Sequence, residues 1–158
     1  MGFLAFGATA ESVGLAFYKR ARALRSTWSA EELRRLGAGE RAKRDHIAKL
    51  NAALGPGQAV LPEDFAEVIP ASELTDRKAV LNAGMRIEEL VIGVYLNGVG
   101  YAKDEGSRIL MGRLIASCTQ QRAGLRVLAG LAADSGLPTP IDLEPAGDRL
   151  DAFLKDPS

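Results

Sequence analysis

The chain has 158 residues, the size of one ordinary domain, and is long enough to bury a hydrophobic core without crosslinks. Its 20 basic and 20 acidic side chains cancel, so it lacks the electrostatic footprint of a protein that binds nucleic acid or an anionic membrane. Its single cysteine, Cys118, excludes an internal disulfide and any cysteine-rich zinc or iron–sulfur site.

The first predicted helix covers residues 4–25, where apolar side chains recur at helical spacing. Residues 1–10 are apolar and end in an Ala-Thr-Ala sequence that resembles a signal cleavage site, but they carry no basic segment. We interpret these residues as the first turns of the helix. The alternative that a leader was removed ahead of this chain stays open. No apolar run reaches the roughly 18 residues that cross a bilayer. We therefore expect a soluble protein, cytoplasmic by default, without a membrane partner.

The second predicted helix covers residues 29–54. Ser29 followed by Glu32 is typical of a capping box, and the Gly-Pro-Gly sequence at 55–57 ends the helix. A link with three prolines follows, over residues 55–74.

The third predicted helix covers residues 76–102, with Thr75 as its N-cap. The fourth covers residues 105–134, and a short helix at 148–154 is expected to pack on the outside.

The links between the four long helices are short, long and short in turn, at residues 26–29, 55–74 and 103–104. This pattern predicts an all-α fold, an antiparallel four-helix bundle with one long crossover between helices two and three and a short C-terminal helix. We expect a single domain over residues 1–158, with its core at 4–134 and a tail at 135–158.

The inward stripes of these helices are apolar except near their middles. Six polar side chains interrupt them there: Glu11, Glu40, Lys43, Glu88, Ser117 and Gln121. His46 flanks the stripe of the second helix. Buried charges tend to be paired or metal-bound, so these side chains predict one central polar site.

An internal repeat relates the first and third helices. Glu11 precedes Tyr18 by seven residues, and Glu88 precedes Tyr95 by seven. Two similar helical hairpins would place equivalent residues across a pseudo-twofold axis.

The stretches 11–18 and 87–95 resemble the first and third helices of ferritin-like proteins. The chain is most similar to the small bacterial ferritin-like domain family that includes desiccation-related proteins, over roughly residues 8–132. The resemblance implies that helices one and three each supply one Glu, and helices two and four each supply Glu-x-x-His, to two iron or manganese ions.

Carried over to this chain, Glu11 and Glu88 match the two single-Glu ligands. In the second helix the motif falls on Lys43 to His46, which keeps the His and replaces the Glu by Lys.

In the fourth helix the motif falls on Gln121 and Gly124, and both ligands are missing. A three-residue shift puts Cys118 and Gln121 there and still supplies neither Glu nor His. Half of the expected ligand positions survive.

Two interpretations of Lys43 stay open. Its ammonium either forms a buried ion-pair network in the place of the metals, or it reaches the surface and pairs with Glu40. Around the centre we expect a second layer of side chains: Tyr18, Tyr95, Ser117 and Cys118. The two tyrosines either donate hydrogen bonds from the core or, in an oxidative enzyme, carry a radical; Cys118 is expected to be a small buried core residue.

Three helical glycines flank the predicted centre: Gly14, Gly84 and Gly124. They favour close helix packing, or alternatively a cavity for a small ligand.

The leading functional hypothesis is a binding or structural module without redox catalysis, with a homodimer as one option and no nucleic-acid partner. The alternative is a di-iron or manganese oxidoreductase, or an iron-handling protein. In that case Glu11, Glu40, His46 and Glu88 would hold one divalent iron or manganese ion.

Overall fold

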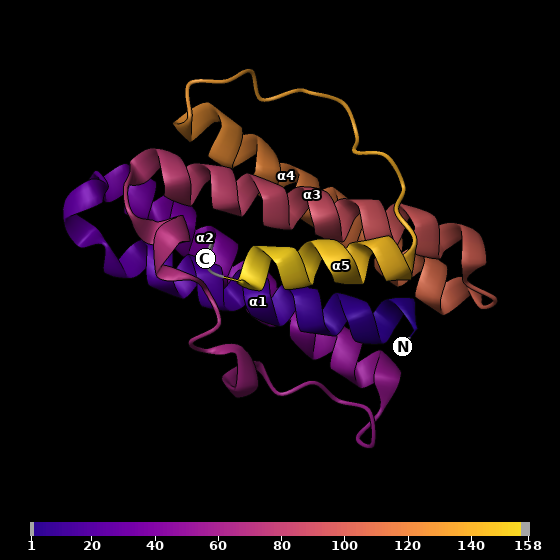
Figure 1. Ribbon diagram of the computed structural model, residues 1–158. Helices are drawn as coiled ribbons and strands as arrows, with labels where there is room; N and C mark the ends of the chain where they lie inside the picture. Colours follow the sequence, from indigo (N-terminus) through magenta and orange to yellow (C-terminus); the bar gives the residue numbers. More distant parts are fainter. Residues whose placement is uncertain (1, 156–158) are drawn as a thin grey trace.

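The computed structural model describes residues 2–155, so Met1 and residues 156–158 of the predicted domain lie outside it. The described residues form five α-helices and no strand, which confirms the prediction of an all-helical chain (Figure 1). The helices are α1 (Phe3–Ala23), α2 (Ala30–Leu54), α3 (Arg77–Tyr101), α4 (Glu105–Leu128) and α5 (Leu143–Leu154). None of these helices is both long enough and apolar enough to cross a membrane.

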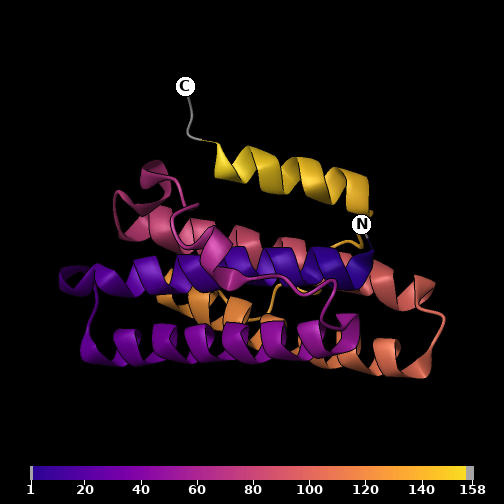
Figure 2. The same cartoon turned by 90° about the horizontal axis from the view of Figure 1, so that it is seen from below.

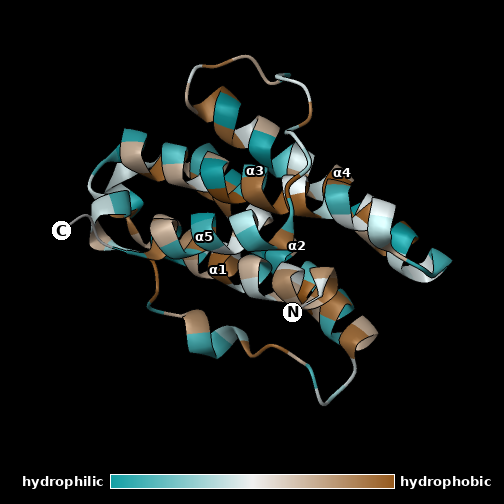
Figure 3. Ribbon diagram, turned by 45° about the vertical axis from the view of Figure 1, so that its right-hand side comes forward, coloured by the Kyte–Doolittle hydropathy of each residue, from teal (hydrophilic) through white to brown (hydrophobic). Residues whose placement is uncertain are grey.

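The four long helices lie side by side. α1 packs along α2 and α3 packs along α4, and the two pairs meet through contacts of α1 with α3 and of α2 with α4. α5 lies outside, across α1 and α3 (Figures 1 and 2). Polar and apolar residues alternate along each ribbon (Figure 3), which is the helical periodicity expected from the sequence.

Side-chain caps mark where the long helices begin. At α2, Ser29 Oγ accepts a hydrogen bond from the Glu32 amide at 3.2 Å, and the Glu32 carboxylate accepts one from the Ser29 amide at 2.8 Å. The predicted capping box is therefore confirmed. At α3 the N-cap is Asp76, whose carboxylate accepts from the Ala79 amide at 2.9 Å. The prediction of Thr75 is wrong, because its hydroxyl donates to the carbonyl of Ser72 instead.

Two helix ends differ from the predicted ones. α4 ends at Leu128, six residues before position 134, because Gly130 adopts a φ of 74° that continues no right-handed helix. α5 begins at Leu143, five residues before position 148. Its first turn contains Pro145, which a helix tolerates there because the missing N–H would have no partner.

The inward face of α4 is rotated by about one residue from the predicted stripe. Met111, Leu114, Cys118 and Leu125 are buried, whereas Ser117 and Gln121 are only partly buried. Apolar residues occur in neighbouring pairs along α4, so the spacing alone fits either rotation.

Candidate functional site

Charged side chains from three helices meet in the interior. Glu11 of α1, Lys43 of α2 and Glu88 of α3 are each 0% exposed. The Lys43 Nζ lies 2.8 Å from Oε2 of Glu88 and 2.8 Å from Oε2 of Glu11. Both contacts are ion pairs, and the one with Glu88 also has the geometry of a hydrogen bond. Lys43 therefore does not reach the surface, and of its two interpretations the buried ion pair is the one observed.

Two tyrosines donate hydrogen bonds to the buried carboxylates, each to the glutamate on the other helix. Tyr18 of α1 donates to Oε1 of Glu88 on α3 at 2.9 Å. Tyr95 of α3 donates to Oε1 of Glu11 on α1 at 3.0 Å. α1 thus supplies the hydroxyl for the carboxylate of α3, and α3 supplies the hydroxyl for the carboxylate of α1.

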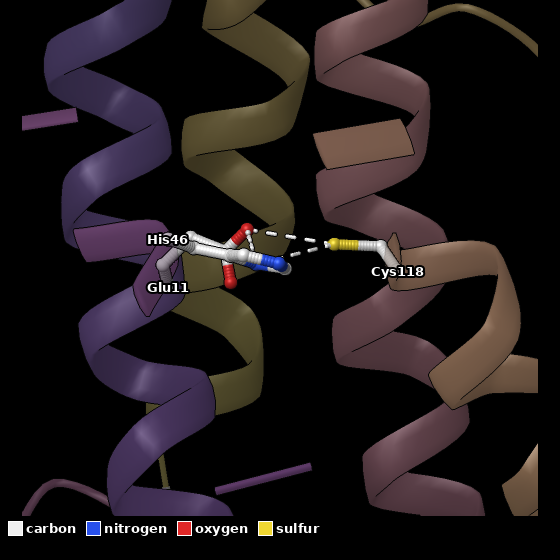
Figure 4. Close-up of side chains that lie close together, drawn as sticks. All are labelled: Glu11, His46 and Cys118. Carbon is white, nitrogen blue, oxygen red and sulfur yellow. Dashed lines mark hydrogen bonds and ion pairs between the residues drawn. The ribbon is translucent and has the colours of Figure 1, made fainter. Parts of the chain in front are cut away.

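His46, Ser117 and Cys118 extend the cluster toward α4. The His46 ring lies with Nδ1 3.1 Å from Glu11 Oε1 and Nε2 2.8 Å from Ser117 Oγ. The Cys118 Sγ lies 3.5 Å from Glu11 Oε1 and 3.9 Å from His46 Nδ1. Figure 4 shows the side chains of Glu11, His46 and Cys118 pointing toward one another. All three are buried and could together hold a metal ion.

The charges in the cluster stabilise one another. Burial acts to raise the pKa of Glu11, but the Lys43 charge and the His46 hydrogen bond outweigh it and bring this pKa to about 2. Burial lowers the pKa of Lys43, but its negative neighbours raise it well above its usual value. Burial, with the Glu11 charge, raises the pKa of Glu88. Burial and the same charge raise the pKa of Cys118 well above that of a free thiol. At neutral pH, Glu11 is therefore a carboxylate, Lys43 an ammonium and Cys118 a thiol.

Three residues expected at the centre lie elsewhere. Glu40, a partly buried residue of α2, forms ion pairs with Arg22 and with Arg44, the latter at 2.8 Å. The prediction that Glu40 lies among the central carboxylates is wrong, because these two guanidiniums hold its carboxylate away from Lys43. Gln121 and Gly124 line a shallow pocket beside Tyr18.

Side chains fill the space beside most of the inner glycines. A Cβ on Gly14 would lie 3.0 Å from Lys43 Cε, and one on Gly84 would lie 2.7 Å from Phe17 Cζ. Gly14 and Gly84 therefore permit close helix packing, which is one of the two predictions made for them. The alternative prediction, a cavity for a small ligand, is wrong at these two positions. Gly7 and Gly39 make room for the rings of Tyr95 and Tyr18. Helical spacing alone does not pair either glycine with its tyrosine, because the two residues of each pair lie far apart in the sequence.

A separate pocket of about 690 Å³ lies between α3, α5 and the segment that joins α4 to α5. Its apolar lining includes Ile87, Leu90, Ile141, Leu150 and Phe153. Its charged lining consists of Arg86, Glu89, Arg122 and Arg149. Arg122 donates to Glu89 from Nε at 3.0 Å and from Nη2 at 2.7 Å, so the wall of this pocket is held by a forked ion pair.

Comparison of the chain with protein-family models, with curated proteins and with solved structures gave no match.

Proposed function

We propose that this chain is a ferritin-like four-helix bundle in which a buried ion pair takes the place of two metal ions, and that it acts as a structural or binding module rather than a di-iron or manganese oxidoreductase. The observation that carries this proposal is the Lys43 ammonium, 2.8 Å from a carboxylate oxygen of both Glu11 and Glu88. The crossed bonds from Tyr18 and Tyr95 support the resemblance, because they join two equivalent helical pairs.

The residues present do not fit a two-metal centre. Two divalent ions need carboxylates from several helices to offset their charge. Here α2 contributes the ammonium of Lys43 and α4 contributes the thiol of Cys118. The ammonium pairs with both Glu11 and Glu88 and would repel a metal ion placed between these two carboxylates.

Metal content tests this proposal directly. Protein produced with added iron and manganese, and purified without chelator or affinity tag, is analysed for both metals per chain. We expect both to fall far below one per chain, with no oxidase, peroxidase or catalase activity. Near-stoichiometric iron or manganese accompanied by turnover would overturn the proposal.

Stability gives a second test of the ion pair. Lys43→Met should lower the free energy of unfolding by about 3–5 kcal/mol at pH 7, because it leaves two carboxylates buried without their cation. The matched control is Lys49→Met on the same helix. Lys49 pairs with Asp45 at the surface, so this change should cost less than about 1 kcal/mol. Equal losses in the two variants would show that the buried ammonium is not needed.

The pocket beside α5 supports the binding role. Its volume falls within the roughly 300–1,000 Å³ typical of small-molecule sites. Of the three arginines in its lining, Arg86 pairs with Glu73 and Arg122 with Glu89, whereas Arg149 has no ion-pair partner among residues 2–155. An apolar wall with excess positive charge suits a small amphipathic carboxylate.

Dodecanoate is a suitable probe, with binding followed by calorimetry and by amide shifts of Leu150 and Phe153. We expect Arg149→Glu to weaken binding at least tenfold. Arg113→Glu makes the same charge change on an exposed turn of α4, outside the pocket, and should leave the affinity unchanged. Equal affinities for both variants, or no binding to the wild type, would remove the ligand-binding part of the proposal.

A further inference from the structure

We propose that Glu11, His46 and Cys118 form a binding site for a single zinc ion, next to the Lys43 ion pair. This site goes beyond the proposed function and does not depend on it. It uses a cysteine thiolate, takes one ion rather than two, and holds a metal without redox chemistry.

The geometry of the three donor atoms fits one tetrahedral ion. The distances are 3.1 Å from Glu11 Oε1 to His46 Nδ1, 3.5 Å from Glu11 Oε1 to Cys118 Sγ, and 3.9 Å from Cys118 Sγ to His46 Nδ1. Zinc bonds of about 2.0–2.3 Å at tetrahedral angles separate neighbouring donors by roughly 3.3–3.6 Å. Adjustments of a few tenths of an ångström would therefore bring all three atoms into coordination. The donors come from α1, α2 and α4, so the ion would join three helices (Figure 4).

The charge balance of the cluster favours a divalent ion at this position. With both glutamates ionised, Glu11, Glu88 and Lys43 leave one net negative charge in the interior. On zinc binding, a zinc–sulfur bond forms and the thiol proton of Cys118 is released to solvent. The cluster gains one net positive charge in this step and becomes neutral. A neutral buried cluster costs less desolvation energy than a charged one.

Neighbouring groups hold the ligands in position. Ser117 Oγ lies 2.8 Å from Nε2 of His46, the ring nitrogen that the metal does not use. When Nδ1 binds the metal, the imidazole proton resides on Nε2 and is donated to this hydroxyl. Tyr95 orients Glu11 through Oε1. Oε2 of Glu11 stays 2.8 Å from the Lys43 Nζ, so this carboxylate offers the metal Oε1 alone.

The donor set selects zinc over iron and manganese. One thiolate, one imidazole and one carboxylate suit a borderline-soft ion, whereas manganese prefers oxygen-rich sites. Cobalt(II) replaces zinc in tetrahedral sites, and a thiolate ligand adds a sulfur-to-metal charge-transfer band in the near ultraviolet.

The test uses the full chain without an affinity tag, stripped by chelator and titrated with zinc or cobalt(II). We expect one zinc per chain and the charge-transfer band with cobalt. Cys118→Ser should abolish the band and weaken zinc binding at least 100-fold. Ser117→Ala should weaken it about tenfold. The matched control is Thr119→Ala, the neighbour of Cys118 on α4, which should bind zinc like the wild type.

A wild-type chain that binds less than 0.1 zinc per chain at about 10 μM free zinc, or that binds cobalt without the band, would overturn the site. The cobalt spectrum of the wild type decides the question even if Cys118→Ser does not fold. Failure here differs from failure of the proposed function, because the first concerns zinc and the second concerns iron and manganese turnover.

Discussion

Single residues at the centre have unequal numbers of partners. Glu11 Oε1 is approached by Tyr95, His46 and Cys118, whereas within residues 2–155 Glu88 Oε1 has the Tyr18 hydroxyl alone. A buried charged acceptor that loses its last donor suffers the full desolvation cost, and one that keeps another donor does not. The two equivalent tyrosines therefore differ in importance.

Tyr18→Phe should lower the free energy of unfolding by about 1.5–3 kcal/mol, because it leaves Glu88 Oε1 without a hydrogen-bond donor. Tyr95→Phe should cost clearly less, because His46 still contacts Glu11 Oε1. Urea denaturation at pH 7 measures both. A larger loss in Tyr95→Phe than in Tyr18→Phe would contradict the partner assignment.

Gly39 controls where the Tyr18 ring can lie. A Cβ there would sit 2.6 Å from Tyr18 Cζ, so Gly39→Ala should push the ring from Glu88 and destabilise the protein by about 1–3 kcal/mol. Gly112→Ala is the matched control, because Gly112 is exposed within α4 and its added methyl would meet no atom within 4 Å. It should stabilise the chain by up to about 1 kcal/mol. Guanidinium unfolding compares the two, and stabilisation in both would rule out this packing.

Helices are joined at their ends by one arginine. Arg77, in the first turn of α3, donates to Glu32 Oε1 near the start of α2 at 2.6 Å and to the carbonyl of Leu128, the last residue of α4, at 2.9 Å. Its guanidinium also lies over the Trp28 ring, 5.1 Å from the centroid. The carbonyl at the end of α4 thereby gains a cationic donor where the helix dipole favours one.

This junction should make stability depend on pH. The hydrogen bond from Arg77, with those from Ser29, brings the pKa of Glu32 to about 2 from an ordinary value of 4.5. A carboxyl with a lowered folded-state pKa stabilises the protein fully above pH 4.5, and this contribution is lost as pH falls toward 2. Stability of Glu32→Gln should therefore fall less steeply over that range than stability of the wild type. Arg77→Gln removes the same hydrogen bond from the donor side and should show the same weaker pH dependence of stability. If both variants lose stability with falling pH as steeply as the wild type, Glu32 does not carry this pH dependence.

The molecule as a whole consists of four long helices around one polar cluster and a fifth helix on the outside. The α1–α2 and α3–α4 pairs share the central polar cluster, whereas α5 rests on them through Ala146, Leu150 and Phe153. The segment before α5 is tied to α3 by a bond from the Ile141 amide to the Gly93 carbonyl at 3.0 Å. Gly93 permits this approach, because a Cβ would lie 2.9 Å from the Thr139 carbonyl oxygen.

Native-state hydrogen exchange should therefore find α5 opening at a lower free energy than the four long helices, because it has fewer neighbours to hold it. Phe153→Ala, which removes a ring buried under Arg86, should speed exchange in α5 and leave the slowest amides of α1 and α3 unchanged. Equal acceleration throughout the chain would mean that α5 unfolds only with the rest.

The helical class, most helix positions and the capping box at Ser29 could be predicted from the amino-acid sequence. These follow from spacing and capping chemistry, which act within a few residues. The sequence also predicted that Glu11, Glu88 and Lys43 interrupt apolar stripes, because a charge on such a stripe must meet other polar groups.

The rotation of α4 and the partners of Lys43 could not be predicted from the sequence, because they depend on packing between distant segments. Adjacent apolar residues on α4 fit two rotations, and packing against the other helices selected the one that buries Cys118 rather than Ser117. The flexible Lys43 side chain could extend toward Glu40 or toward the interior. Arg22 and Arg44 hold Glu40, while Glu11 and Glu88 approach from other helices, so the choice depended on side chains distant in sequence.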